Sequence, residues 1–164
     1  MKEIKADKYS IWIGEKSISK LDVSKYSKIG ILVDENTKEF CLPLLSKIKK
    51  SIVIEIKSGE ENKNIDSCNL IWEALTKNCF DRNSLLINLG GGVIGDMGGF
   101  CASTYKRGID FIQIPTSLLA MVDASVGGKL GIDFNGLKNQ VGLFSNPKSV
   151  IINHKFLETL ADNE

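Results

Sequence analysis

The chain has 164 residues, enough for one domain with a sizeable core, and its 43% hydrophobic and 25% charged residues are typical of a globular protein. Its 21 basic and 20 acidic residues leave a net charge of +1, which excludes the basic surface typical of proteins that bind nucleic acid or anionic membranes. Apolar runs such as residues 30–33 are too short to cross a bilayer and residues 1–5 lack the apolar core of a signal peptide, so we expect a soluble, cytoplasmic protein.

Short apolar runs and helical patterns alternate along the chain. Strands are predicted at residues 28–33, 51–56, 85–89, 110–114 and 149–152, and helical segments at about 37–50, 64–79, 93–105 and from 154 onward. Pro43 marks a first turn or a kink in the first of these helical segments. The strands are apolar throughout, which is typical of a parallel sheet covered on both faces. We therefore predict an α/β fold: a Rossmann-like, mostly parallel sheet with helices on both faces and an antiparallel edge hairpin at residues 4–13.

The cysteines and the single histidine argue against a metal site. Cys41, Cys68, Cys79 and Cys101 form no Cys-x-x-Cys pair and have no His nearby. If Cys68 and Cys79 share one helix they lie roughly 16 Å apart, too far for a disulfide. We expect all of them to be buried, reduced packing residues. His154 cannot form a metal site alone, and we expect it at the surface or capping a helix.

A glycine-rich segment after the third predicted strand carries the strongest local signal. Gly90, Gly92 and Gly95 match Gly-x-Gly-x-x-Gly between a predicted strand and a predicted helix. Without Cβ atoms the backbone can approach a pyrophosphate, and a helix N-terminus attracts anions. The context favours a nucleotide site over the alternative, a tight strand-to-helix turn. Asp96 fits first-turn capping or a hydrogen bond from a ribose hydroxyl.

Polar loops follow four of the predicted strands, at residues 34–36, 58–63, 90–96 and 115–117. Ligands of open α/β sheets bind outside the carboxyl ends of the strands, so these loops are expected to share one site. Carboxylates suit ribose hydroxyls there and Lys63 could neutralise a phosphate, although each loop alone is compatible with an ordinary polar surface. Asp110 stands at the beginning of a strand, and we therefore do not expect it to bind ribose.

The segment at residues 116–131 has little periodicity and holds Asp123 and Lys129 among small residues, followed by Lys138 and Asn139. Charges among small residues suggest a close-packed polar site. The alternative for either lysine is a solvated surface charge.

Together these motifs resemble those of 3-dehydroquinate synthases. The matching stretches are Gly90-Gly-Gly-Val-Ile-Gly-Asp96, Thr104-Tyr-Lys-Arg-Gly108, Ile114-Pro-Thr-Ser-Leu-Leu-Ala120, Val122-Asp-Ala-Ser-Val-Gly-Gly-Lys129 and Lys138-Asn-Gln-Val-Gly142. The resemblance covers nearly the whole chain, and the stretch ending at Lys129 is its most specific part. It implies an NAD-binding domain over residues 1–164 of a two-domain enzyme about twice as long. The uncapped helical pattern at the C-terminal end also suggests a fragment.

The resemblance implies a shikimate-pathway reaction on a sugar acid phosphate. In this family 3-deoxy-D-arabino-heptulosonate 7-phosphate becomes 3-dehydroquinate and phosphate through transient oxidation by NAD, phosphate elimination, reduction and aldol closure. It also implies a homodimer and a divalent metal, zinc or cobalt, bound by a Glu and two His in a C-terminal helical domain. This chain lacks those ligands, so we expect it to be inactive alone.

Site residues are implied position by position. An NAD shell is implied at Asp34, Asn36, Ser58, Gly59, Glu60, Glu61, Asn62, Lys63, Gly91, Gly92, Val93, Ile94, Gly95, Asp96, Thr116, Ser117, Leu119, Lys129, Lys138, Phe156, Leu157, Glu158 and Thr159. Substrate contacts are implied at Asp123, Lys129, Lys138 and Asn139, and Arg107 resembles an arginine that reaches the neighbouring subunit's site. The residues at Ser117, Met121, Ala124, Leu130 and Leu137 depart from the family pattern, while the charged residues stay.

Two alternatives remain open at this point. One is another sugar phosphate cyclase such as 2-deoxy-scyllo-inosose synthase, which shares these motifs. The other is a nucleotide-binding module without catalysis. The coding sequence that follows Glu164 would discriminate them, because it either holds a Glu and two His with zinc spacing or does not.

Overall fold

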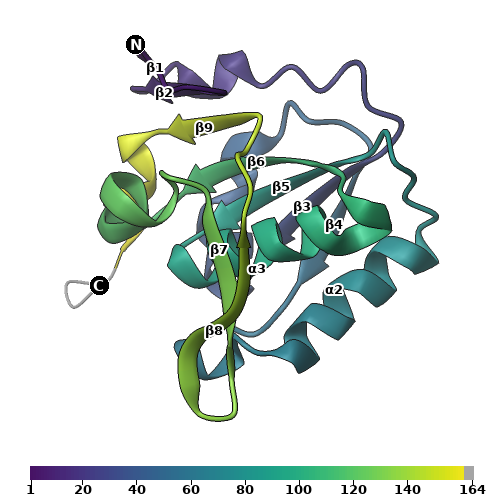
Figure 1. Cartoon of the computed structure of the whole chain (residues 1–164). Coiled ribbons are helices and arrows are strands. Elements are labelled where there is room, and N and C mark those ends of the chain that lie inside the picture. Colours follow the sequence, from purple (N-terminus) through teal and green to yellow (C-terminus); the bar gives the residue numbers. More distant parts are fainter. Residues whose placement is uncertain (161–164) are drawn as a thin grey trace.

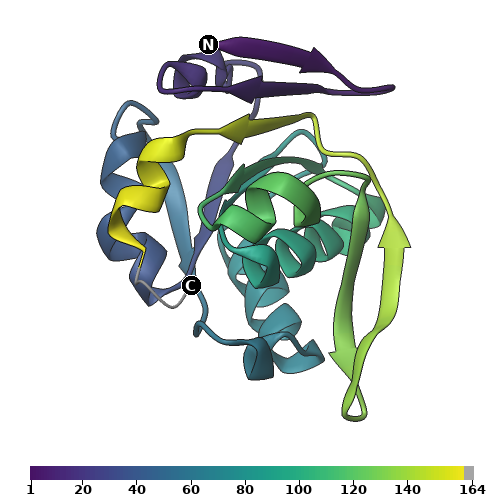
Figure 2. The same ribbon diagram turned by 90° about the vertical axis from the view of Figure 1, so that its left-hand side faces the viewer.

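A sheet of seven strands lies between two helical layers in the computed structural model, which describes residues 1–160 (Figures 1 and 2). Its strands are β1 (Lys2–Lys5), β2 (Ser10–Ile13), β3 (Ile29–Val33), β4 (Ser51–Glu55), β5 (Leu85–Gly90), β6 (Asp110–Pro115) and β9 (Ser149–Ile152). The α-helices are α1 (Glu35–Phe40), α2 (Ile65–Lys77) and α3 (Gly92–Thr104). Each of the five strands predicted from apolar runs is confirmed to within one residue at either end.

The order of the strands fixes where a ligand can bind. The sheet runs β1-β2-β9-β6-β5-β3-β4, and every neighbouring pair is parallel except β1 and β2, the predicted edge hairpin. From β3 the chain crosses first to β4 on one side and then to β5 on the other. The strands β4-β3-β5-β6-β9 thus follow the doubly wound order 2-1-3-4-5, whose ligands bind where the connections diverge. In this chain that point lies between the carboxyl ends of β3 and β5.

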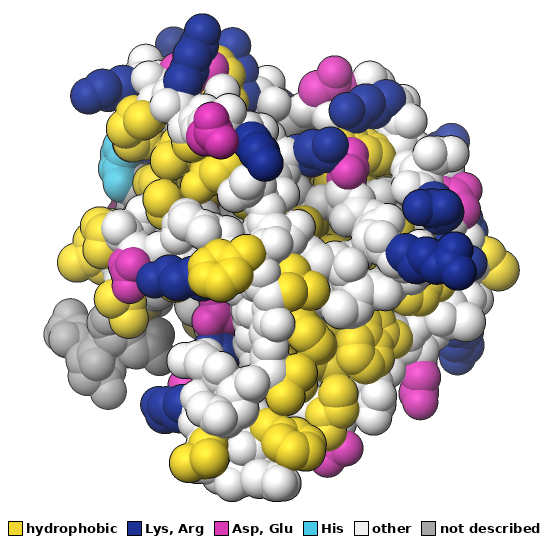
Figure 3. Space-filling model, in the orientation of Figure 1, with side chains coloured by type: hydrophobic (Ala, Val, Ile, Leu, Met, Phe, Trp, Pro, Cys, Tyr) yellow, Lys and Arg dark blue, Asp and Glu magenta, His cyan; other side chains and the backbone are white. Residues whose placement is uncertain are grey.

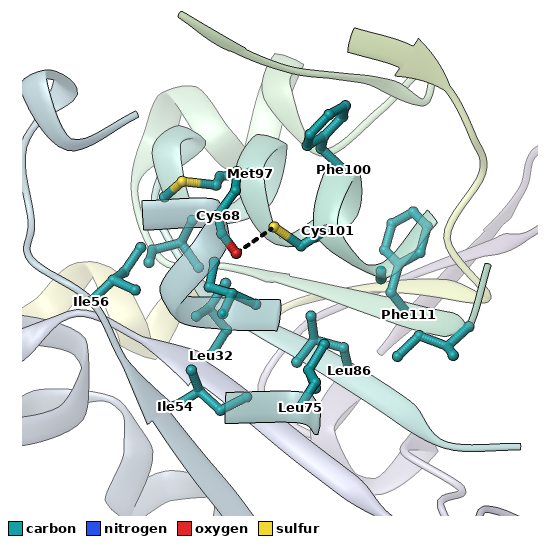
Figure 4. Close-up of a cluster of buried hydrophobic side chains, with 14 of the residues drawn as sticks. Leu32, Ile54, Ile56, Cys68, Leu75, Leu86, Met97, Phe100, Cys101 and Phe111 are labelled. Atoms are coloured by element: carbon teal, nitrogen blue, oxygen red, sulfur yellow. Dashed lines mark hydrogen bonds between the residues drawn. The ribbon is translucent and has the colours of Figure 1, made fainter. Parts of the chain in front are cut away.

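Each face of the sheet carries its own apolar core, because the central strands are buried on both sides. Leu32 and Leu86 point toward α2 and α3 and pack with Leu75 and Met97 (Figure 4). Alternate residues such as Ile31 point to the opposite face, where the core includes Cys41, Leu45 and Phe156. The predicted helices on both faces are therefore confirmed.

Helix α3 packs unusually close to the sheet because Gly98 faces Asn88 of β5. A Cβ atom built at Gly98 would lie 2.1 Å from Asn88 Oδ1 and 2.7 Å from Leu32 Cδ2. The Asn88 amide is 1% exposed, and neither of its polar atoms has a hydrogen-bond partner within residues 1–160. The amide is thus confined by the helix on one side and by the sheet on the other.

We expect Gly98→Ala to lower the free energy of unfolding by about 1–3 kcal/mol, because neither Asn88 nor Leu32 has space to move. Gly92→Ala is the matched control: a Cβ there meets only Ala124 Cβ, at 3.6 Å. Urea unfolding of both variants measures the difference. Equal stability of the two variants would show that the sheet can shift away from α3 and make room for a Cβ at Gly98.

Two of the predictions for local structure are wrong and a third is confirmed in part. The helix expected at 37–50 ends at Phe40, and Pro43 begins a separate 3₁₀ turn, Leu42–Leu45, because proline lacks the N–H that would continue the helix. Helix α2 ends at Lys77, so Cys79 lies outside it, at φ 53°, and is exposed, unlike the other three cysteines. The pattern from 154 onward forms a 3₁₀ helix, His154–Thr159, and its continuation over 161–164 lies outside the described residues.

A β-hairpin that we did not predict leaves the body of the molecule after a π-helical turn, Ala120–Ala124 (Figure 2). Its strands β7 (Lys129–Phe134) and β8 (Leu137–Phe144) pair antiparallel in a separate sheet. Asn135 and Gly136, both at positive φ, form the turn, which is the conformation that Asn-Gly favours in two-residue hairpins. β7 packs on α3 through Leu130 and Ile132, while β8 is exposed almost throughout and contributes only the partly buried Leu143 to this core.

Within residues 1–160, every helix is too short or too polar to cross a membrane.

Candidate functional site

A cleft of about 550 Å³ opens where the connections of the sheet diverge, at the carboxyl ends of β3 and β5. The loops after β3, β4, β5 and β6 and the 3₁₀ helix at 154–159 supply its walls. Its lining is Asp34, Asn36, Thr37, Phe40, Cys41, Lys57, Ser58, Gly59, Gly91, Gly92, Val93, Ile94, Thr116, Ser117, Leu119, Phe156, Thr159 and Leu160. All four polar loops predicted from the sequence therefore meet at one site.

Asp34 begins the wall that follows β3 and caps helix α1. Its Oδ1 accepts hydrogen bonds from Thr37 N at 2.7 Å and from Thr37 Oγ1 at 2.9 Å, and the Asp34 N–H donates back to Thr37 Oγ1. This reciprocal cap fixes the carboxylate at the edge of the cleft. Burial, with a smaller effect of Asp34, raises the pKa of the nearby Cys41 thiol to about 11. Cys41 is therefore protonated at neutral pH and is a wall residue rather than a nucleophile.

A carboxylate joins the loops after β3 and β4. Glu35 accepts hydrogen bonds from Ser58 Oγ at 2.6 Å and from Ser58 N at 2.9 Å. The bond from the Ser58 hydroxyl, followed by the backbone bonds, lowers the pKa of Glu35. Asn62 Nδ2 in turn donates to Ser58 O at 2.6 Å. These bonds hold the second cleft wall in place without any ligand.

The three motif glycines have different physical roles. A Cβ at Gly90 would lie 2.5 Å from Ile94, so this glycine permits the turn itself. A Cβ at Gly95 would come within 3.3 Å of Gln113 Oε1, so this glycine lets α3 approach the sheet. Gly92 has no neighbour that close: a Cβ there would meet only Ala124 Cβ, at 3.6 Å. It lines the cleft as the first residue of α3, where the helix has N–H groups without intrahelical partners. The motif therefore combines packing with an open helix N-terminus.

Lys63 does not line the cleft. Its ammonium lies in the interior, with 5% of the side chain exposed, and donates to Asp96 Oδ2 at 2.6 Å and to Asn139 Oδ1 at 2.7 Å. Burial raises the pKa of Asp96, and the hydrogen bond and charge of Lys63 oppose that rise. The structure thus places Lys63 in an internal ion pair with Asp96, whereas the sequence suggested that it could neutralise a phosphate.

The predicted substrate residues lie beside the cleft rather than in a close-packed site. Asp123 and Lys129 are 4.0 Å apart with about two-thirds of each side chain exposed, and Lys138 lies 3.1 Å from Glu60 with 71% exposed. The hairpin that carries both lysines also exposes apolar side chains, among them Leu137 and Phe144. Figure 3 shows hydrophobic side chains exposed over the lower part of this face of the molecule. The suggested close-packed polar site does not form, and the alternative of a solvated surface charge holds for both lysines, because the hairpin that carries them projects into solvent.

Arg107 ends a short corner between α3 and β6. It and Lys106 both have positive φ, 69° and 51°, a conformation that is strained in residues other than glycine. Its side chain is exposed and does not line the cleft.

Several other predicted residues also lie outside the cleft lining, namely Glu60, Glu61, Asn62, Gly95, Leu157 and Glu158. Conversely, five lining residues were not predicted from the sequence: Thr37, Phe40, Cys41, Lys57 and Leu160. Thr37 could have been found from the capping pattern that begins at Asp34. Asp110 lies at the far end of β6, where Tyr26 Oη donates to it at 2.9 Å, as its place at the beginning of a strand predicted.

Solved structures with a similar fold include enzymes that bind a nicotinamide cofactor. A 2-deoxy-scyllo-inosose synthase, complexed with carbaglucose-6-phosphate, NAD+ and Co2+, superposes with a TM-score of 0.84 at 22% identity, over 94% of this chain and 46% of that one. A 2-epi-5-epi-valiolone synthase from Streptomyces hygroscopicus, with NAD+ and Zn2+ bound, superposes with a TM-score of 0.82 at 22% identity, over 98% of this chain and 47% of that one. At this identity the likeness shows the fold.

Sequence comparison identifies the family of the chain, which the shared fold alone does not. The 3-dehydroquinate synthase of Parabacteroides distasonis is 54% identical over 83% of this chain and 39% of its own length. The 3-dehydroquinate synthase of Sulfurimonas denitrificans is 46% identical over 100% of this chain and 47% of its own. The chain thus spans less than half the length of these relatives. The family described as 3-dehydroquinate synthase N-terminal matches residues 53–164. The chain therefore belongs to the 3-dehydroquinate synthase family, to whose N-terminal domain it corresponds.

Proposed function

We propose that the chain binds NAD+ in the cleft and forms the NAD-binding part of a 3-dehydroquinate synthase. The observation that carries the proposal is that Gly92, the first residue of α3, lines the cleft and places no side chain between the cleft and the first N–H groups of that helix. A pyrophosphate fits such a position because backbone donors and the helix dipole favour negative charge there. The capped Asp34 carboxylate suits a ribose hydroxyl.

Residues on the cleft rim would orient the two ends of the cofactor. The apolar side chains of Phe40, Phe156 and Leu119 line the cleft and suit a flat ring, while Thr116 and Ser117 add hydroxyl groups. When bound, NAD+ would supply reversible hydride acceptance. The chain's own contribution is to hold the cofactor, to exclude water from one side and to present Lys129 and Lys138 nearby.

For the longer enzyme we propose the family's reaction, which converts 3-deoxy-D-arabino-heptulosonate 7-phosphate to 3-dehydroquinate and phosphate. Asp123, Lys129, Lys138 and Asn139 would contact this anionic substrate. The exposure of both lysines supports the role, since neither ammonium is committed to the interior. The relatives at 43–54% identity carry this name, which favours it over another sugar phosphate cyclase and over a non-catalytic module.

The divalent metal would be bound outside this chain. Among residues 1–160, no three His, Cys, Asp or Glu side chains come together as a metal site. The structures of related fold with Co2+ or Zn2+ are about twice as long as the part they share with this chain. We therefore propose that residues 1–164 form a cofactor domain that is inactive alone.

We also propose that the longer enzyme is a cytoplasmic homodimer. Arg107 is exposed, away from its own cleft and held in a strained corner, which suits a guanidinium that serves the partner's phosphate site. Exposed apolar side chains on β8, including Phe144 at 83%, support an interface between copies.

Titration calorimetry of this chain with NAD+ tests the cofactor proposal. We expect saturable binding in the millimolar range, because the loops that line one side of the cleft are in place while nothing in residues 1–160 closes over it. Circular dichroism establishes that the chain is folded. Absence of saturation by a folded chain would contradict the proposal.

A further inference from the structure

Hydrogen bonds join the β7–β8 hairpin to the second cleft wall, the loop that follows β4. The binding of NAD+ in the cleft does not itself require these bonds. Asp133 N donates to Lys63 O at 2.8 Å, Lys63 Nζ donates to Asn139 Oδ1, and Asn139 N donates to Asp133 Oδ1 at 2.8 Å. These three bonds form a closed ring through both strands of the hairpin. Lys138 adds an ion pair with Glu60 beside it.

Asp133 is placed for this contact by an irregularity in the hairpin. The register of β7 and β8 shifts between Ile132 and Phe134, so the backbone of Asp133 is not paired with a residue of β8. Its N–H is therefore free to turn toward Lys63. Asn139 completes the ring from a left-handed conformation, φ 53°, which a non-glycine residue adopts only at a cost.

The hairpin needs such an anchor. A two-stranded hairpin is marginally stable by itself in water, and β8 is exposed almost throughout. Leu130 and Ile132 fix the base of β7 on α3, while Asp133 fixes the hairpin near its turn. On the other side of the ring, Asn62 ties the Lys63 segment to Ser58 in the cleft wall.

We propose that Asp133 is a positioning residue that couples the cleft wall Ser58–Lys63 to the hairpin that carries Lys129 and Lys138, so that a ligand in the cleft also orders the hairpin. The proposal rests on the proposed NAD+ site for its ligand. Asp133 is not among the site residues predicted from the sequence. The ring bonds only backbone groups, Lys63 and Asn139, so Asp133 acts through these groups and contacts no cofactor.

Hydrogen exchange of the 164-residue chain, followed by mass spectrometry, tests the ring without any ligand. We expect Asp133→Ala to speed exchange about tenfold in residues 133–144 and by a smaller factor in residues 58–64. Asn139 N loses its acceptor, so the Asn139 Oδ1 that accepts from Lys63 Nζ is no longer held in place, while the Asp133 N–H still donates to Lys63 O. Asp133→Asn keeps an acceptor oxygen and should stay within about threefold of the unmodified chain. Gln140→Ala is the matched control: its amide bonds only Lys138 O on the same hairpin.

Exchange with saturating NAD+ then tests the coupling. In the unmodified chain NAD+ should slow exchange in both segments, whereas in Asp133→Ala it should slow only 58–64. If NAD+ protects 58–64 of the unmodified chain and leaves the hairpin unchanged, the coupling is overturned. If NAD+ does not bind at all, the proposed function fails, and the exchange without ligand still decides the ring.

A second variant keeps the inference testable if Asp133→Ala does not fold. Asn139→Gly removes Oδ1 but tolerates positive φ and keeps the backbone N–H that donates to Asp133. It should speed exchange in both segments, and Asn139→Asp, which keeps an acceptor, should not. Equal exchange in all these variants would overturn the role of the ring.

Discussion

Gly92→Val should weaken NAD+ binding at least about a hundredfold, close to 3 kcal/mol, while the chain stays folded. A valine side chain at the first residue of α3, which lines the cleft, would crowd the first N–H groups of that helix, so a phosphate could no longer reach those donors. The fold should tolerate the change because a Cβ at Gly92 meets only Ala124 Cβ, at 3.6 Å. Calorimetric titration measures the affinity, and urea unfolding measures the stability.

Thr104→Val is the matched control for that variant. It places the same side chain at the last residue of α3, away from the cleft, and removes only local bonds to Phe100 O and Cys101 O. Its NAD+ affinity should equal that of the unmodified chain. If Gly92→Val also binds NAD+ as well as the unmodified chain, the N-terminus of α3 is not the phosphate site.

The parts of this fold that follow from local chemistry were predictable. Continuous apolar strands define a parallel sheet, and the rule that ligands bind at carboxyl ends brings the loops at Asp34, Ser58, Gly91 and Thr116 together. The glycine motif was also correctly placed between β5 and α3. These inferences depend on short-range patterns that every strand and turn carries in its own sequence.

The burial of individual charges was not predictable in the same way. Lys63 lies in a polar run of residues 58–64 that resembles a solvated loop, yet its ammonium is inside because Asp96, 33 residues later, lies opposite. The hairpin at 129–144 was not predicted because Gly131 and Gly142 weaken the β propensity of its two strands, although Asn135-Gly136 signals the turn. Long-range pairs and solvent-exposed hairpins leave little trace in local patterns.

Lys63→Met should lower the free energy of unfolding at pH 7 by about 3 kcal/mol and the melting temperature by roughly 6–12 °C. The change leaves the Asp96 carboxylate, with one-fifth of its side chain exposed, without its cation. It also removes a donor from Asn139 Oδ1. Methionine fills much of the same volume, so lost packing contributes little.

The loss should depend on pH in a defined direction. Burial already raises the pKa of Asp96 in the folded chain, and without Lys63 the pKa should rise further. The folded variant then binds more protons than its unfolded chain, so its stability falls as the pH rises from about 4 through the raised pKa of Asp96. Relative to the unmodified chain, the deficit should therefore shrink as the pH is lowered from 7 toward 4.

Two comparisons isolate the buried pair as the cause. Lys129→Met removes a lysine that is 66% exposed and 4.0 Å from Asp123, so it should change stability by less than about 0.5 kcal/mol at every pH. Adding Asp96→Asn to Lys63→Met should recover part of the stability at pH 7, because a neutral amide needs no cation beside it. It should also abolish the pH dependence of stability that comes from Asp96, because an amide does not titrate. A deficit that is the same from pH 4 to 7, or that the second substitution leaves unchanged, would mean that Lys63 supports the hairpin through Asn139 rather than the charge of Asp96.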